Sequence, residues 1–223
     1  SSNGKYIWAI NIDNSILFRN NKWKKTNGNL KQLSVTDSGS IWGINNSNNI
    51  FYRPNFKGSW KKINGGLSFI VVSGDGNHIW GSIGDSVYYR QGLTDNWKHI
   101  KGGSLKYITV SYDGKLVYGI GKDYKLYKID NPTDNSNDKF HKINSSNKNW
   151  KTIDISSNGK ILIAITNNNK VFYTEIKEEE MEQDPENIIG DCKYKFNDWI
   201  DSYKDSSIKK CFQQDIFDKC PSG

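Results

Sequence analysis

The sequence predicts an all-β protein built from four-stranded antiparallel sheets arranged radially, which is the architecture of a β-propeller. A segment that opens on an aromatic residue recurs at positions 23, 60, 97 and 140, with spacings of 37, 37 and 43 residues. One propeller blade takes about 40–50 residues. Each copy holds short apolar-alternating stretches separated by Gly, Asn and Asp turns, as antiparallel strands require. No copy carries a useful apolar period of 3.6 residues, which excludes a solenoid of helices.

The copy that opens with Trp60-Lys61-Lys62-Ile63-Asn64-Gly65-Gly66 shows the order of elements most clearly. Residues 67–72 are mostly apolar, with Leu67 and Ile70 to Val72 at positions that recur in the other copies, and they predict a strand. Asp75-Gly76 predicts a tight turn, because such dipeptides favour the positive φ of hairpin turns. Residues 79–81 and 87–90 predict two further strands. With equivalent segments in the other copies, the sequence predicts four full repeats.

The first residues match the middle of a repeat. Ser1-Ser2-Asn3-Gly4 resembles Ser156-Ser157-Asn158-Gly159, and residues 16–19 resemble a last strand. An N-terminal half blade therefore precedes the full repeats, and we expect five blades. Two interpretations stay open: either the ring closes by pairing the half blade with strands from elsewhere, or the chain is a processed or truncated piece.

The C-terminal region follows a different pattern. Residues 177–190 are polar and acidic, and then Phe196, Trp199, Ile200 and Tyr203 fall at the spacing of an amphipathic helix. Ile208, Cys211, Phe212 and Ile216 repeat that spacing. We therefore expect two domains: a propeller over residues 1–176, and an acidic junction with a small Cys-containing helical hairpin over residues 177–223. The hairpin is too small to fold alone and should dock on the propeller or on a partner.

Charge and composition narrow the classes of function. Residues 1–176 carry 24 Lys and Arg against 12 Asp and Glu, a net charge of +12, while residues 177–223 carry a net charge of −5. The basic part could attract anionic partners, or could simply be a solvated surface. The longest apolar runs are a few residues, so no transmembrane segment is expected. We also expect no enzyme, metal site or cofactor, because the three His and the carboxylates show no catalytic or metal-ligand spacing, and no nucleic-acid motif is present.

The copies that begin at Trp23 and Trp60 resemble the tectonin β-propeller repeat. They share the opening Trp-Lys-Lys, the inner Ile-Trp-Gly at 41–43 and 79–81, and a last strand that ends in Arg53 or Arg90. The later copies have Tyr118 and Lys128 at the expected Trp and Arg positions, or lack both. The resemblance covers residues 1–176. It implies a lectin-like protein that binds glycans or lipopolysaccharide, and family members usually have six blades.

The leading hypothesis is non-catalytic recognition of surface glycans through repeated blade loops. The loops before the last strands should share one face of the propeller, and they supply polar groups for sugar hydroxyls. The candidate ligand residues are Asn11, Asp13, Asn45, Asn46, Asn48, Asp85, Asp123, Asn167 and Asn168. Ordinary turn chemistry is the competing interpretation of these residues. Six recurrent Trp and the three Arg are interpreted as packing between blades rather than as sugar contacts.

The alternative hypothesis is a structural or adaptor propeller that docks in a larger assembly through residues 177–223. All three cysteines lie in that region, and a helical hairpin would bring Cys192 beside Cys220 as a disulfide, leaving Cys211 free. A disulfide would accompany an extracellular or cell-surface protein, whereas three reduced thiols would accompany a cytoplasmic one.

Overall fold

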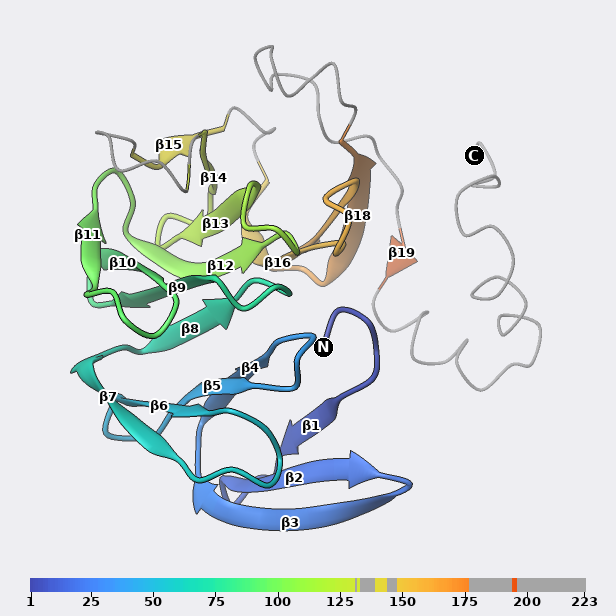
Figure 1. The fold of residues 1–223 in the computed structure, drawn as a ribbon. Helices are drawn as coiled ribbons and strands as arrows, with labels where there is room; N and C mark the ends of the chain where they lie inside the picture. Colours follow the sequence, from blue (N-terminus) through green and yellow to red (C-terminus); the bar gives the residue numbers. More distant parts are fainter. Residues whose placement is uncertain (131, 133–138, 144–147, 177–193, 196–223) are drawn as a thin grey trace.

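The computed structural model describes residues 1–130, 132, 139–143, 148–176 and 194–195. These residues form five antiparallel sheets and no helix. The sheets follow one another along the chain as an arc around a common axis (Figure 1). The prediction of an all-β protein with five blade-like sheets is therefore confirmed. The proposed helical hairpin and Cys192, Cys211 and Cys220 lie outside the described residues.

The sheets are named here in chain order. Sheet 1 contains β1 (Ile7–Ile10), β2 (Ser15–Asn20) and β3 (Lys22–Asn29). Sheet 2 contains β4 (Gln32–Val35), β5 (Ile41–Ile44), β6 (Asn49–Arg53) and β7 (Lys61–Gly66). Sheet 3 contains β8 (Phe69–Val72), β9 (His78–Ile83), β10 (Ser86–Gln91) and β11 (Lys98–Ile100). Sheet 4 contains β12 (Leu105–Val110), β13 (Val117–Gly121), β14 (Leu126–Ile129) and β15 (His141–Lys142). Sheet 5 contains β16 (Trp150–Ile155), β17 (Ile161–Thr166), β18 (Lys170–Glu175) and β19 (Tyr194–Lys195).

The structure corrects the phase of the sequence repeat. The Trp-Lys-Lys segment does not begin a sheet. Instead it leads into the outer strand of the preceding sheet, so that β7 pairs with β6 and β3 pairs with β2. The reason is that a short hairpin keeps consecutive strands together, whereas the following segment carries the chain inward to begin the next sheet. Among the described residues, sheet 1 thus has three strands, and its edge strand β1 lacks the inner partner that β4 gives β5.

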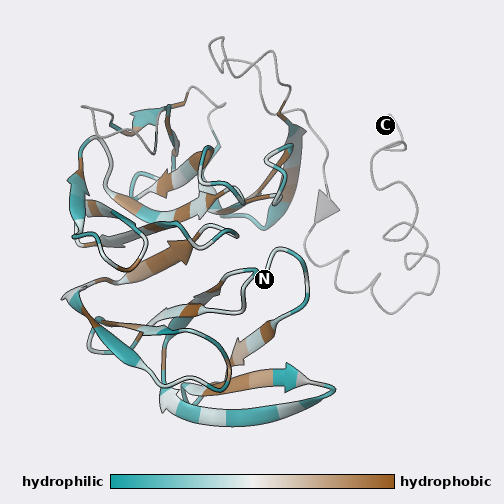
Figure 2. Cartoon of the chain, in the orientation of Figure 1, coloured by the Kyte–Doolittle hydropathy of each residue, from teal (hydrophilic) through white to brown (hydrophobic). Residues whose placement is uncertain are grey.

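Hydrophobic side chains lie between neighbouring sheets. In Figure 2 the inner strands are largely hydrophobic, whereas the outer strands β3 and β7 are mainly hydrophilic. Three buried clusters fill the spaces between consecutive sheets, and they are centred on Trp42, Trp80 and Trp150. The inner strands are also joined by polar contacts, because the amide of Gln32 on β4 both donates to and accepts from the backbone of Ile70 on β8, each at 3.0 Å.

Arginine and tryptophan hold sheets 1 and 2 together. Arg53, on β6, is buried and lies between the rings of Trp8 and Trp60, with its guanidinium carbon 5.8 and 5.5 Å from their centroids. Trp8 belongs to β1 of sheet 1, whereas Trp60 leads into β7 of sheet 2, the sheet that contains Arg53. Trp60 in turn donates its indole N–H to the carbonyl of Asn27 on β3 at 2.9 Å. This combination of stacking and hydrogen bonding is called the joint below.

A second joint connects sheets 2 and 3 with the same geometry. Arg90 lies 5.8 Å from each of the rings of Trp42 and Trp97, and Trp97 donates to the carbonyl of Asn64 at 2.9 Å. Gly65, with φ of 105°, lies against the Trp97 ring, and an added Cβ would come within 3.1 Å of Trp97 Cδ1. The proposed packing role of these Arg and Trp residues agrees with both joints.

The third contact between sheets departs from this pattern. Cross-strand pairing puts Ile129 of β14 at the position of Arg53 and Arg90, and Lys128 at the position of Tyr52 and Tyr89. The sequence-based assignment of Lys128 to the arginine position was therefore wrong by one residue. Because side chains on a strand alternate between faces, that shift turns Lys128 toward the opposite face of its sheet, and the buried Ile129 packs against sheet 3 instead.

The two sheets at the ends of the arc are not joined in this way within the described residues. Trp23, on β3, is the counterpart of Trp60 and Trp97, yet 48% of its surface is exposed. Ile7 is 43% exposed, although its counterparts Ile41 and Ile79 are fully buried. The packing role proposed for Trp23 is therefore not realised here, because no described sheet lies against this side of sheet 1.

Replacing Gly81 by Ala tests the close approach of strands inside sheet 3. A methyl group there would lie 2.7 Å from the carbonyl oxygen of Phe69 and would also meet Leu67. Such overpacking costs about 1–3 kcal/mol of unfolding free energy, measurable by urea denaturation. In the control Gly66→Ala the nearest atom is 3.5 Å away, and we expect little change. Equal losses in the two variants would contradict the packing described for sheet 3.

Replacing Arg53 by Lys tests the first joint. The guanidinium donates to the carbonyls of Gly58 and Phe56 and to Thr26 Oγ1, at 2.7, 2.6 and 2.9 Å, and a lysine cannot make all three bonds. We expect a loss of about 1.5–3 kcal/mol in the free energy of unfolding. The control is Arg19→Lys, at the equivalent but exposed position of sheet 1, for which we expect a change under about 0.5 kcal/mol. A similar loss in both variants would show that the joint is not the cause.

Candidate functional site

A pocket of about 280 Å³ lies beside the first joint, between sheets 1 and 2. Its lining combines two aromatic rings, two lysines, the joint arginine and two polar residues: Phe18, Phe56, Lys24, Lys25, Arg53, Thr26 and Asn27. β2 and β3 supply one wall, and β6 with the segment that follows it supplies the other. The pocket therefore takes its shape from packed strands and from the buried Arg53.

The aromatic floor of the pocket is a stacked pair. The rings of Phe18 and Phe56 are nearly parallel, with centroids 4.9 Å apart and an interplanar angle of 8°. Phe18 is buried, whereas Phe56 is 37% exposed and presents part of its ring to solvent. Arg53 fixes the backbone at this point, since its Nη2 donates to the Phe56 carbonyl. The result is a rigid aromatic surface on which the apolar face of a sugar ring could stack.

Lysine supplies the charge of the pocket. Lys24 pairs across the strands with Phe18, so both side chains lie on the side of sheet 1 that faces sheet 2. Among the residues that the structure describes, Lys24 has no hydrogen-bond or ion-pair partner. Lys25 is different, because its ammonium lies 3.7 Å from the Asp13 carboxylate. Lys24 is therefore the cation in this pocket that is available to an anionic group on a ligand.

The pocket is not repeated at the second joint. Cross-strand pairing and the spacing from the joint arginine put Tyr52, Ile63 and Leu93 at the positions of Phe18, Thr26 and Phe56. The stacked phenylalanine pair and the threonine hydroxyl are therefore absent there. Asn64 is retained, and its carbonyl accepts the hydrogen bond from Trp97. The two joints thus provide a natural comparison between a pocket with an aromatic floor and a position without one.

The predicted loop residues lie in the turns between β1 and β2, β5 and β6, β9 and β10, β13 and β14, and β17 and β18. Most of their side chains take part in contacts close to their own turns. Asn11 accepts from Ile12 N, Asp13 from Ser15 N and Asn45 from Asn49 N, at 2.9–3.0 Å. Asn168 accepts from Thr166 Oγ1, and Asn48 from Lys31 Nζ, both at 2.5 Å. Asn46 and Asn167 are exposed. These contacts favour turn chemistry for this set, and its role in ligand binding stays a prediction.

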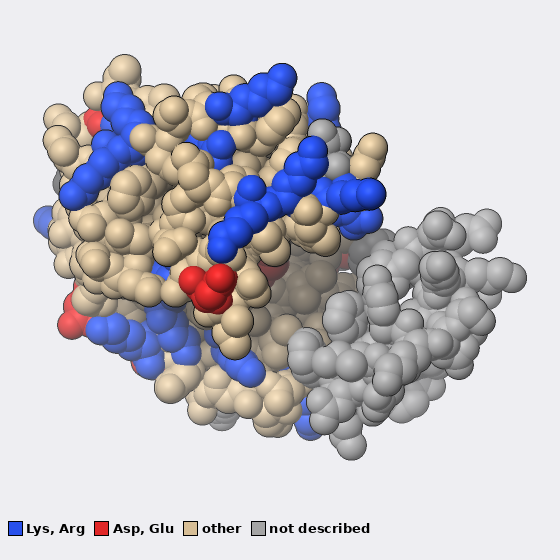
Figure 3. Space-filling model, turned by 90° about the horizontal axis from the view of Figure 1, so that it is seen from below, with Lys and Arg blue, Asp and Glu red and all other residues tan. Residues whose placement is uncertain are grey.

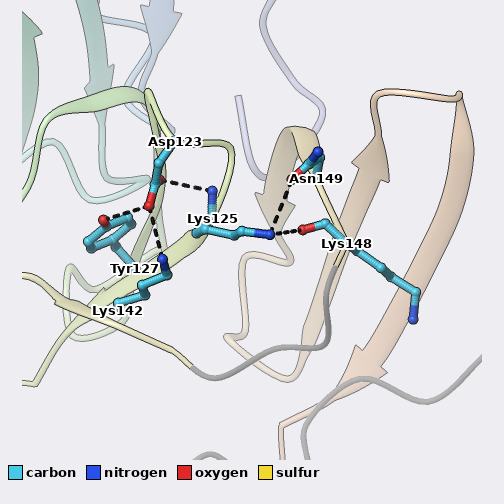
Figure 4. Close-up of polar contacts among 6 residues, drawn as sticks. All are labelled: Asp123, Lys125, Tyr127, Lys142, Lys148 and Asn149. Atoms are coloured by element: carbon cyan, nitrogen blue, oxygen red, sulfur yellow. Dashed lines mark hydrogen bonds and ion pairs between the residues drawn. The ribbon is translucent and has the colours of Figure 1, made fainter.

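Two acidic loop residues make several hydrogen bonds: Asp85 connects sheet 3 to sheet 4, whereas Asp123 bonds within sheet 4. The Asp85 carboxylate accepts from Lys122 Nζ at 2.6 Å and from Ser104, and these bonds lower its pKa. The Asp123 carboxylate accepts from Lys125 N, Tyr127 OH and Lys142 Nζ at 3.0–3.1 Å (Figure 4). Partial burial works to raise the pKa of Asp123, but these hydrogen bonds outweigh it and the pKa is lowered. Both carboxylates are thus ionised and already engaged.

A second cavity, of about 360 Å³, lies along the common axis. It is lined by four inner strands, by Gly74, Tyr112 and Ser157 in the following turns, and by the first two residues of the chain. Asp154 is the only acidic residue in its lining, and one of its oxygens accepts from Thr109 Oγ1 at 2.9 Å. In the described part of the chain, no cluster of His, Cys, Asp and Glu is placed to hold a metal ion. The axial cavity therefore offers hydroxyl groups, one carboxylate and the Tyr112 ring, but its lining contains no lysine or arginine.

Sequence reasoning did not find Phe56, Lys24 or the pocket that they share. Phe56 stands in an irregular segment after Arg53, outside the alternating pattern that identified the strands. A signal existed in the comparison of repeats, since Phe56 and Leu93 both stand three residues after an arginine. Phe56 is aromatic and Leu93 is aliphatic, although the two copies that contain them otherwise match closely. Such a difference within a repeat distinguishes a local feature from the shared framework.

The described residues contain no helix that could cross a membrane. Comparison with solved structures finds matches that include a β-propeller domain. The β-propeller domain of Cps50 (Swd1) from Myceliophteria thermophila aligns with a TM-score of 0.66 and 7% identity, over 87% of this chain and 70% of that domain. YCF48 bound to a D1 peptide aligns with a TM-score of 0.56 and 13% identity, over 85% of this chain and 63% of YCF48. At these identities the likeness shows the fold alone.

A third structure, from the mitotic checkpoint complex, aligns with a TM-score of 0.55 and 12% identity, over 66% of this chain and 47% of that one. This chain therefore spans only part of each of the three structures. A search of curated proteins finds no match. The family model described as the tectonin domain matches residues 1–175. This match confirms the resemblance read from the Trp-Lys-Lys repeats, and the chain belongs to the tectonin family.

Proposed function

We propose that this protein is a non-catalytic, lectin-like carbohydrate-binding protein, and that the pocket beside the first joint holds a sugar residue. The observation that carries the proposal is the partly exposed Phe56 ring on a rigid floor, next to Lys24. A pyranose has one apolar face suited to an aromatic ring and hydroxyl groups that need directional partners. The exposed Asn27 lies at the same pocket, and its side-chain amide can both donate and accept such hydrogen bonds.

The charge of the molecule supports a preference for acidic saccharides. Lysine and arginine are spread over the face shown in Figure 3, where acidic side chains are fewer. A carboxylate, sulfate or phosphate group on a glycan would gain a charge-assisted contact with Lys24. The surface charge would raise the rate of encounter with an acidic glycan on a cell or bacterial surface. An extracellular or cell-surface location goes with this proposal.

Replacing Phe56 by Ala tests the pocket directly. On a glycan array with the full chain, we expect the bound glycans to be retained about tenfold more weakly, since a lost stacking contact costs about 1.4 kcal/mol. The matched control is Leu93→Ala, at the equivalent position of the next sheet, for which binding should not change. Thermal unfolding of both variants separates loss of binding from loss of the fold. Absence of any glycan signal from the folded wild type would contradict the function, and equal effects of the two variants would contradict the site.

The charge preference has a separate test. Lys24→Gln should weaken binding of acidic glycans while leaving neutral glycans of the same backbone unaffected. Lys61→Gln is the control, because Lys61 occupies the position of Lys24 in the next repeat. Titration at two salt concentrations would show the expected screening in the wild type. Equal binding of acidic and neutral glycans by the wild type would contradict the preference.

A second candidate function is that of an adaptor propeller within a larger assembly. The specific observation in its favour is that apolar side chains are exposed on the end sheets, including Ile7 and Trp23 on sheet 1. Native mass spectrometry of the protein from its natural source, with and without reductant, separates the two functions. A monomer that binds glycans supports the lectin, whereas stable association with other chains and no glycan binding supports the adaptor.

A further inference from the structure

The last sheet presents an uncovered apolar face. Each middle sheet has a back face that lies toward the preceding sheet and a front face that lies toward the following sheet. In sheets 2 and 3 the joint arginine is on the back face. In sheet 5 the back face is buried, with Leu162, Ala164 and Phe172 packed against sheet 4. Ile161, Ile163 and Ile165 of β17 lie on the front face, together with Val171, Tyr173 and Glu175 of β18. All six are partly or largely exposed.

The exposure of this face is unusual for its position in the repeat. Cross-strand pairing shows that Ile163 is the counterpart of Trp42, Trp80 and Tyr118, which are all at most 2% exposed. Ile163 is 45% exposed, because no described element lies over it. An apolar face of this kind is normally covered in a soluble protein.

The chemistry of the face argues against sheet 1 as its cover. At both joints, the arginine of the following sheet lies over a tryptophan of the front face, Trp8 or Trp42. Sheet 1 would bring Arg19 to the corresponding place, over Ile163. An aliphatic side chain has no π system to attract a guanidinium. The same mismatch applies whether sheet 1 comes from this chain or from a second copy.

The path of the chain favours a different cover. β19 pairs with the beginning of β18, with Tyr194 opposite Val171 and Lys195 opposite Lys170. The chain beyond Lys195 is therefore attached to the edge strand of sheet 5. Residues 196–223 contain apolar residues such as Phe196, Trp199 and Ile200. A segment tethered this close has an effective concentration of about the millimolar range at the face.

Charge does not distinguish between the possible covers, because residues 196–223 carry four Lys and five Asp, a net charge of −1. We propose that residues 196–223 dock on the front face of sheet 5 and cover Ile161, Ile163, Ile165 and Val171. This segment is then an integral cover of the last sheet in the arc, not an independent module. The proposal does not depend on the proposed glycan site.

Photo-crosslinking in the full chain tests which element covers the face. A photoreactive benzophenone amino acid replaces Ile163, and mass spectrometry identifies the crosslinked peptides and whether they join one chain or two. We expect crosslinks within one chain to peptides from residues 196–223. The same amino acid at Ile12, which is 98% exposed in the β1–β2 turn, is the control and should not give these crosslinks. Crosslinks to sheet 1, crosslinks between two chains, or no crosslinks at position 163 would each overturn the proposal.

Limited proteolysis gives an independent test. In Ile163→Asp the charged side chain should displace the cover, so that trypsin cleaves after Lys204, Lys209 and Lys210 about tenfold faster than in the wild type. Ile12→Asp makes the same chemical change at an exposed turn and should not alter the rate. Circular dichroism checks that both variants fold. If Ile163→Asp does not fold, the crosslinking experiment alone tests the proposal. Unchanged cleavage in a folded Ile163→Asp variant would overturn the proposal.

Discussion

The stacking of a buried arginine between two tryptophans is the interaction on which the arrangement of the first three sheets depends. Arg53 and Arg90 each contact a tryptophan of the preceding sheet and one that leads into the outer strand of their own. A buried guanidinium is costly unless its donors are satisfied, and here backbone carbonyls accept from it. The same side chain is thus held by hydrogen bonds and by ring stacking, and together these contacts determine how each of these sheets packs against the preceding one.

The candidate binding site is a consequence of the same joint. Arg53 holds the backbone carbonyl of Phe56, and Phe56 stacks on Phe18 of the neighbouring sheet. The Arg53 side chain therefore both stabilises the fold and shapes the pocket. The second joint has the same framework with Leu93 in place of the exposed ring. The pocket thus distinguishes the first joint from the second through three substitutions, Tyr52, Ile63 and Leu93 replacing Phe18, Thr26 and Phe56, on the same repeated framework.

The repeat in the sequence predicted the strands, the turns and the number of sheets, because alternation and Asp-Gly turns are local properties. The assignment of Trp60 and its counterparts to the wrong sheet shows the limit of that reasoning, since pairing between strands is not local. The pocket depended on a contact between Phe18 and Phe56 from different sheets, which spacing could not indicate. The polar loop residues were found readily, but Asn and Asp serve turns as often as ligands, and their contacts favour turns here.

The most direct test of the joints is the exchange of indole N–H protons with solvent, followed by NMR on the full chain. The Trp60 and Trp97 protons are hydrogen-bonded to Asn27 and Asn64 carbonyls, and they should exchange slowly. Trp23 occupies the same repeat position, but no sheet in the described part of the chain lies beside it, so its proton should exchange rapidly. Slow exchange at all three would contradict the exposed side of sheet 1, and rapid exchange at all three would contradict the joints themselves.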